Sequence, residues 1–107
     1  GLACLHDKEK NLIIGTAGIL KCNYLGREDF EFGFIIGREY WDQGYASEIG
    51  QAQIDFCLQD LELDRVLALT NISNERSQVV LERLGMAFVK TIETESRGVR
   101  KIYLKEA

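Results

Sequence analysis

The sequence predicts an α/β (α+β) fold, a mixed and mostly antiparallel sheet with a central parallel β-α-β crossover. Apolar runs at both ends of the chain form pairs separated by polar turns, as in β-hairpins. Between them, a helical pattern is followed by residues 66–69, an unbroken apolar run typical of a strand covered on both faces in a parallel sheet. With 107 residues and no proline, repeat or linker, residues 1–107 are predicted to form one domain.

The predicted order is β-β-β-α-β-α-β-β. The strands are expected at residues 2–5, 12–20, 30–36, 65–70, 87–93 and 99–104. In the third strand, alternation places Phe30, Phe32 and Phe34 on one face and leaves Glu31 as the only charge.

Helical spacing predicts the two helices. Polar residues recur every three or four positions over 47–62, which indicates a narrow wet stripe and a broad buried face. A shorter helix over 77–84 ends at Gly85, a residue typical of the C′ position. Gly15 and Gly18 in the second strand indicate a bulge or a close backbone approach.

Charge and hydropathy exclude several classes of function. The net charge of -4 and the pI near 5.0 argue against nucleic acid as a partner. No apolar run approaches the roughly 18 residues of a membrane span, and the first residues lack the basic and apolar regions of a signal peptide. We therefore expect a cytoplasmic protein that does not bind membranes.

The cysteines and the histidine make a metal centre unexpected. Cys4, Cys22 and Cys57 are odd in number and far apart, so they are expected to be buried or half-buried small hydrophobes without a reactive role. His6 is the only histidine, which excludes a histidine metal cluster and argues against a histidine triad. The base of any catalysis is then a carboxylate, a tyrosine, a lysine or water.

Residues 40–48 connect the third strand to the first helix and contain Gly44. A helix that begins after such a turn presents unpaired N–H groups and the positive end of its dipole, which suits a phosphate. The alternative is that Gly44 and the small residues after it form only a turn and a cap.

Four segments in register resemble the GNAT superfamily of acyl-CoA N-acyltransferases, and within it the branch of the ribosomal-protein N-terminal acetyltransferases. They are Glu31-x-Gly33-Phe34, Trp41-x-x-Gly44-Tyr45-Ala46-Ser47-Glu48, Asn71-x-x-Asn74-x-x-Ser77 and Val80-Leu81-Glu82-Arg83-Leu84-Gly85-Met86. The resemblance covers nearly the whole chain and implies a GNAT-like fold.

Two features depart from the family. Its members usually open with a further strand and two helices, so we expect a domain truncated at its N-terminus. Part of the acceptor-binding wall would then be missing or supplied by another chain, which allows a homodimer. Asp42 stands where glycine is usual, and we expect this carboxylate to point away from the cofactor into solvent.

The resemblance implies acetyl-CoA as cosubstrate and a set of residues that bind it. The pantetheine amides would pair with the backbone of Phe34, Ile35 and Ile36. The pyrophosphate would lie on the N–H groups of Gln43, Gly44, Tyr45, Ala46 and Ser47. Asn74 and Ser77 match positions that contact the arm and the adenosine side, or else serve only as an N-cap and a buried small residue.

The implied reaction is attack of a primary amine, either a protein N-terminus or a small amine, on the thioester. Glu31 matches a frequent position of the general base, although it could be only a carboxylate at the rim of the sheet. Leu81 stands where many relatives carry a tyrosine that protonates the departing thiolate, which leaves Ser77, Tyr45 or water as the general acid. The expected function is an N-acetyltransferase; the alternatives are a truncated or inactive acyl-CoA-binding domain and a purely structural domain.

Overall fold

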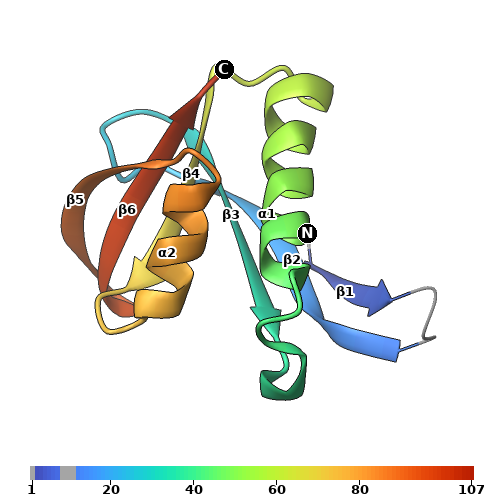
Figure 1. The fold of residues 1–107 in the computed structure, drawn as a ribbon. Coiled ribbons are helices and arrows are strands. Elements are labelled where there is room, and N and C mark those ends of the chain that lie inside the picture. The colour runs from blue at the N-terminus through green and yellow to red at the C-terminus, as the bar shows by residue number, and fades with distance from the viewer. Residues whose placement is uncertain (1, 8–11) are drawn as a thin grey trace.

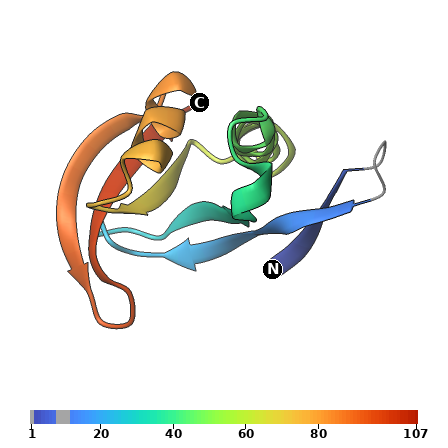
Figure 2. The ribbon, with the colours of Figure 1, turned by 60° about the horizontal axis from the view of Figure 1, so that its bottom comes forward.

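The computed structural model describes residues 2–7 and 12–107. Its six strands form one sheet in the order β1-β2-β3-β4-β6-β5, and two helices lie on one face of it (Figures 1 and 2). The strands are β1 (Leu2–Asp7), β2 (Leu12–Cys22), β3 (Asp29–Ile36), β4 (Arg65–Asn71), β5 (Ala87–Thr94) and β6 (Gly98–Glu106); the helices are α1 (Tyr45–Asp55) and α2 (Glu75–Arg83). In the described part of the chain, β3 and β4 are the one parallel pair. This arrangement confirms the predicted fold class.

The element ends differ from those predicted. Helix α1 begins at Tyr45, two residues early, because Gly44 adopts a φ of 85° and ends the preceding turn there. Its C-terminal continuation, Phe56–Asp60, is π-helical, and a short 3-10 helix at Arg38–Tyr40 was not predicted. Gly85, with a φ of 84°, follows α2 as expected. Most of the turn predicted between β1 and β2 lies outside the described residues.

The hydrophobic core lies between the helices and the sheet. It consists of Phe32, Ile54, Cys57, Val66, Ala68, Leu81, Leu84, Met86 and Tyr103. The prediction of a narrow wet stripe on the first helix was wrong, because Phe56 and Leu61 are also exposed. Cys4 is exposed too, which corrects the expectation that all three cysteines are buried or half-buried.

Two glycines allow neighbouring elements to approach closely. A Cβ atom on Gly15 would lie 1.9 Å from the carbonyl oxygen of Ile35, which confirms the predicted close approach in the second strand. A Cβ atom on Gly50 would lie 2.5 Å from Cδ1 of Leu84, so this glycine lets α1 pack against the end of α2.

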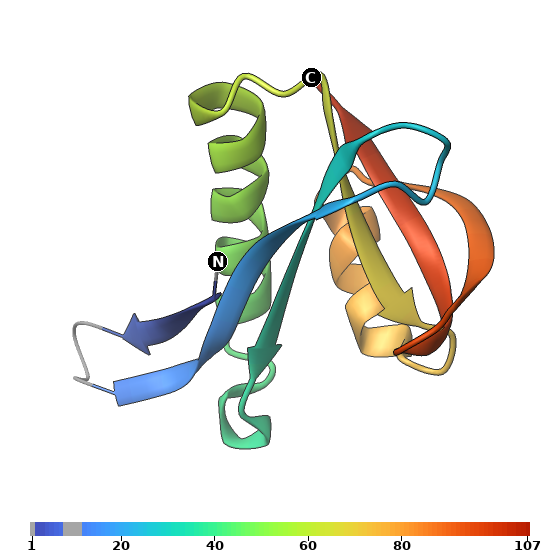
Figure 3. The same ribbon diagram turned by 180° about the vertical axis from the view of Figure 1, so that it is seen from behind.

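Strands β3 and β4 pair over a short length and then separate (Figures 1 and 3). Their register contains only Glu31 with Leu67 and Phe32 with Ala68. At the closed end, Arg65 donates two hydrogen bonds of 2.8 Å to Asp29, whose side chain is fully buried. Both helices begin at the open end (Figure 1).

The buried clamp at the closed end is testable by comparing two aspartates. We expect Asp29→Asn to destabilise the fold by roughly 3 kcal/mol or less, because Arg65 would lose its buried charged partner but keeps some solvent contact. Asp64→Asn is the comparison: Arg27 contacts both aspartates, at 3.5 Å from Asp29 and 2.6 Å from Asp64, but only the Asp64 side chain is exposed. Chemical unfolding of both variants checks this; equal midpoints would contradict it.

Candidate functional site

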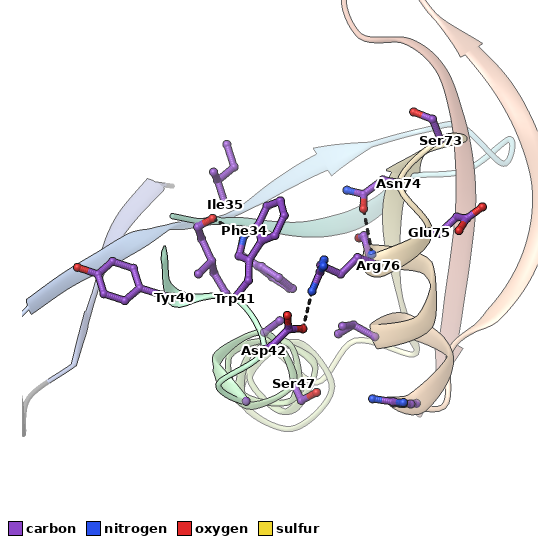
Figure 4. A pocket seen from close by; sticks show the side chains of 16 residues that line it. Phe34, Ile35, Tyr40, Trp41, Asp42, Ser47, Ser73, Asn74, Glu75 and Arg76 are labelled. Atoms are coloured by element: carbon purple, nitrogen blue, oxygen red, sulfur yellow. Dashed lines mark hydrogen bonds and ion pairs between the residues drawn. The ribbon is translucent and has the colours of Figure 1, made fainter. Parts of the chain in front are cut away.

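A cleft of about 820 Å³ occupies the open end between β3 and β4 (Figure 4). It is lined by the end of β3, the loop before α1, the first turn of α1, and one side of α2 from its start to its last residue. The lining residues are Phe34, Ile35, Ile36, Tyr40, Trp41, Asp42, Gly44, Ala46, Ser47, Ser73, Asn74, Glu75, Arg76, Ser77, Val80 and Arg83. Of the predicted cofactor-binding residues, Gln43 and Tyr45 are not among them.

The edge of β3 that faces the cleft carries main-chain polar groups without a strand partner. The N–H of Gly37 donates to Ile14 of β2 at 2.9 Å, so the groups of Ile35 also face β2. Those of Phe34 and Ile36 therefore face the side of β4, beyond the last paired residue, Phe32. Of the three predicted residues, these two offer backbone groups to a ligand.

Trp41 occupies one of these groups. Its indole Nε1–H donates to the carbonyl oxygen of Ile36 at 2.9 Å, which fixes the ring beside the strand edge. The guanidinium groups of Arg76 and Arg38 lie 4.7 and 5.3 Å from the ring centroid, within the range of cation–π attraction.

The first turn of α1 presents unpaired N–H groups. The first hydrogen bond within the helix runs from the N–H of Glu48 to the carbonyl oxygen of Gly44 at 3.1 Å. The preceding N–H groups of Tyr45, Ala46 and Ser47 have no partner inside the helix, as expected of a helix start. Ala46, Ser47 and Gly44 also line the cleft, so the helix start can receive an anion there.

The side chains of the other two predicted residues point elsewhere. The amide of Gln43 donates to the carbonyl oxygen of Glu39 at 3.0 Å. The hydroxyl of Tyr45 donates to Asp7 at 2.5 Å, and this hydrogen bond, more than any other influence, raises the pKa of Tyr45 to about 12. A phenol held in this way is a weak acid and is directed toward the β1–β2 hairpin.

The first turn of α2 brings Asn74 and Ser77 into the cleft. The side-chain oxygen of Asn74 accepts a hydrogen bond of 3.1 Å from the N–H of Ser77, so Asn74 is the N-cap of the helix as well as a lining residue. Leu81 is buried in the core and presents no hydroxyl to the cleft.

Asp42 is exposed, as predicted, but it also lines the cleft and pairs with Arg76 (Figure 4). Its φ of 61° lies in the left-handed region, which aspartate tolerates better than most residues other than glycine. Arg76 was not predicted as a site residue, because no local sequence pattern indicates that this arginine, between Asn74 and Ser77, reaches across to Asp42.

Glu31 is buried and does not belong to the cleft-lining residues. Its carboxylate accepts hydrogen bonds of 2.8 and 3.2 Å from Arg97, which also donates to the hydroxyl of Tyr24. The hydrogen bond that Arg97 donates to Glu31 raises the pKa of Arg97. Because Phe32 faces the helices, Glu31 faces the opposite side of the sheet. Arg97 lies 66 residues away in the β5–β6 turn, and no local signal predicts the contact.

Over residues 2–7 and 12–107, no group of three or more histidine, cysteine, aspartate or glutamate side chains could hold a metal ion. In the same described segments, neither helix has the length and apolar character needed to cross a membrane.

The cleft therefore lies where two parallel strands separate, and two helices begin at its opening. This arrangement is typical of proteins that bind an elongated anionic ligand. The family described as Acetyltransferase (GNAT) domain matches residues 1–87. The chain belongs to the GNAT acetyltransferase family.

Two curated relatives of this chain come from Bacillus subtilis (strain 168). The uncharacterized protein YkkB is 30% identical over 94 residues, which are 88% of this chain and 55% of YkkB. The uncharacterized N-acetyltransferase YnaD is 29% identical over 79 residues, 74% of this chain and 45% of YnaD. The chain thus spans about half the length of these relatives.

Solved structures share the fold. A putative ribosomal-protein-serine acetyltransferase from Vibrio cholerae superposes with a TM-score of 0.85 at 22% identity, covering 99% of this chain and 63% of that one. A chimera of the spermidine N-acetyltransferase SpeG from Vibrio cholerae and hSSAT gives 0.77 at 19% identity, covering 98% and 65%.

The surroundings of Glu31 are testable through Cys22. Burial, followed by the charges of Glu31 and Asp29, raises the pKa of the Cys22 thiol to about 11. At pH 8 only about one Cys22 in a thousand is then a thiolate, the form that reacts with iodoacetamide. We expect the labelling rate of Cys22 to be low at pH 8 and to rise about tenfold for each pH unit up to pH 10. At pH 8 the rate should be higher in Glu31→Gln, because this substitution removes a negative charge near the thiol.

Mass spectrometry of the labelled peptides measures these rates, with exposed Cys4 as the internal reference and Asp64→Asn as the charge control. Equal Cys22 rates in the wild type and Glu31→Gln would contradict the placement of Glu31 beside this thiol.

Proposed function

We propose that this protein is an acetyl-CoA-dependent N-acetyltransferase that moves the acetyl group to a primary amine by direct attack on the thioester. The acceptor is a protein N-terminus or a small amine, and the protein acts in the cytoplasm. Membership of the acetyltransferase family supports the acetyl-transfer chemistry. The names of the structural relatives cover both kinds of acceptor, a ribosomal protein and spermidine.

The single observation that carries the proposal is the cleft at the open end of β3 and β4. Its floor offers the backbone of Phe34, and its mouth offers the helix start at Ala46 and Ser47. An extended ligand with amides at one end and phosphates at the other matches these groups in order. Acetyl-CoA has this composition, so the residues present fit it.

We propose roles for three further residues. Asn74 and Ser77 are proposed to border the arm of the cofactor, and Ser77, one of several hydroxyl-bearing residues that line the cleft, to protonate the departing thiolate. Glu31 is proposed to accept the proton of the amine, directly or through water. It stands beside the last paired residues of β3 and β4, on the face opposite the helices.

A second candidate is an acyl-CoA-binding domain without turnover. Two observations favour it: Arg97 already engages both carboxylate oxygens of Glu31, and Leu81 supplies no acid. A general base must reach the proton that it removes, and a carboxylate committed to a guanidinium does so only after that contact loosens.

Titration calorimetry with acetyl-CoA, followed by chromatographic assay of released CoA, separates the candidates. Chromatography is preferred because exposed Cys4 would react with a thiol reagent. Acceptor-dependent CoA release across N-terminal peptides, polyamines and amino acids supports the transferase. Binding without release across that panel supports the second candidate, and no binding at millimolar acetyl-CoA contradicts both.

The role of Glu31 predicts a specific kinetic change. Glu31→Gln should lower kcat by about 10² to 10⁴, because general-base catalysis is lost, while the affinity for acetyl-CoA is retained. Arg97→Gln is the control, since it removes the partner and leaves the carboxylate. If Glu31 only anchors the β5–β6 turn, both variants will lower the melting temperature and kcat of Glu31→Gln will stay within a few-fold.

A further inference from the structure

An ion pair crosses the mouth of the cleft. Asp42, in the loop before α1, accepts a hydrogen bond from Nη1 of Arg76, in the first turn of α2 (Figure 4). Both residues line the cleft. The pair therefore links the two helix starts at the place where an anionic ligand would enter.

Arg76 is held from a second direction as well. Its guanidinium lies 4.7 Å from the ring centroid of Trp41, and the hydrogen bond from Trp41 to Ile36 fixes that ring. A guanidinium recognises carboxylates and phosphates through the same fork of N–H donors. The carboxylate of Asp42 thus occupies a position on Arg76 that a phosphate oxygen could take.

The pair is built to exchange partners. The side chains of Asp42 and Arg76 are 78% and 51% exposed, and water screens exposed pairs strongly. The Asp29–Arg65 pair differs, because the side chain of Asp29 is fully buried and has no access to another ligand. A doubly charged phosphate can therefore compete with Asp42 for the guanidinium of Arg76, but not with Asp29 for the guanidinium of Arg65.

We propose that Asp42 is an internal anion that competes with the phosphates of the cofactor for Arg76. In the free protein Asp42 holds Arg76 beside Trp41, and in the complex Arg76 binds a phosphate while Asp42 turns to solvent. This inference rests on the proposed function, which identifies acetyl-CoA as the ligand. It predicts that Asp42 weakens binding of every phosphorylated thioester and leaves binding of an uncharged one unchanged.

Asn is the informative substitution at position 42. Asparagine tolerates the left-handed φ of 61° and keeps the size of the side chain, so Asp42→Asn removes only the charge. Asp64→Asn removes the same charge from another exposed pair, with Arg27, at the opposite end of β4. It controls for the change in net charge.

Calorimetry of the wild type, Asp42→Asn, Arg76→Gln and the double variant against three ligands tests the proposal. The ligands are acetyl-CoA, its 3′-dephospho form and S-acetylpantetheine. Asp42→Asn should bind acetyl-CoA about fivefold more tightly, Arg76→Gln should bind it more weakly, and neither should change the affinity for S-acetylpantetheine. The gain from Asp42→Asn should shrink when Arg76 is absent, because the two residues are coupled.

The dephospho ligand identifies the phosphate. An Arg76→Gln effect that disappears with 3′-dephospho-acetyl-CoA assigns Arg76 to the 3′-phosphate, and one that persists assigns it to the pyrophosphate; both agree with the proposal. An equal gain from Asp42→Asn with and without Arg76 indicates plain repulsion and overturns it. An unchanged or weaker affinity of Asp42→Asn, or the same gain in Asp64→Asn, overturns it too.

Failure of the proposed function is seen separately. Binding that follows this pattern without CoA release would leave the exchange intact and remove the transferase. No binding of acetyl-CoA to the wild type would remove both.

Discussion

The short parallel contact between β3 and β4 is the constraint on which the rest of the structure depends. Two residue pairs and the buried Asp29–Arg65 pair hold the strands at one end, and nothing in their register continues beyond Phe32 and Ala68. Parallel strands end at the same edge of a sheet, so the loops that follow them meet there. Helices α1 and α2 consequently begin side by side at the opening, and the cleft is lined by the end of β3, the loop before α1 and both helices.

Local patterns predicted most of the fold. The unbroken apolar run at residues 66–69 indicated a strand covered on both faces, and Val66, Leu67 and Ala68 are buried. Gly85 correctly indicated the end of α2, because its left-handed backbone is a local requirement. The exposure of Phe56 and Cys4 could not be predicted, since it depends on which distant surfaces reach them. The register that ends at Phe32 is likewise decided by packing across the sheet.

In the candidate site, too, features set by neighbouring residues could be predicted and contacts between distant residues could not. The turn at Gly44 and the cap at Asn74 follow from a few neighbouring residues; the cap was one of two roles considered for Asn74, and the start of α1 was predicted two residues too late. Partners that come from distant parts of the chain were not predicted: Arg97 reaches Glu31 across 66 residues, and Arg76 reaches Asp42 across 34. From the sequence alone, a carboxylate in a strand suggests a general base. Whether the carboxylate of Glu31 is free to accept a proton depends on Arg97, which the sequence does not reveal.

The convergence of two helix starts has a consequence for how a ligand arrives. The protein carries a net charge of -4, yet Arg76 lies, beside Asp42 and Glu75, at the same opening as the positive ends of two helix dipoles. Such a field extends over about a Debye length, roughly 8 Å at physiological ionic strength. A polyanion approaching the acidic remainder of the surface is turned away, and its productive collisions are concentrated at the opening. Salt should therefore slow its association more than its departure.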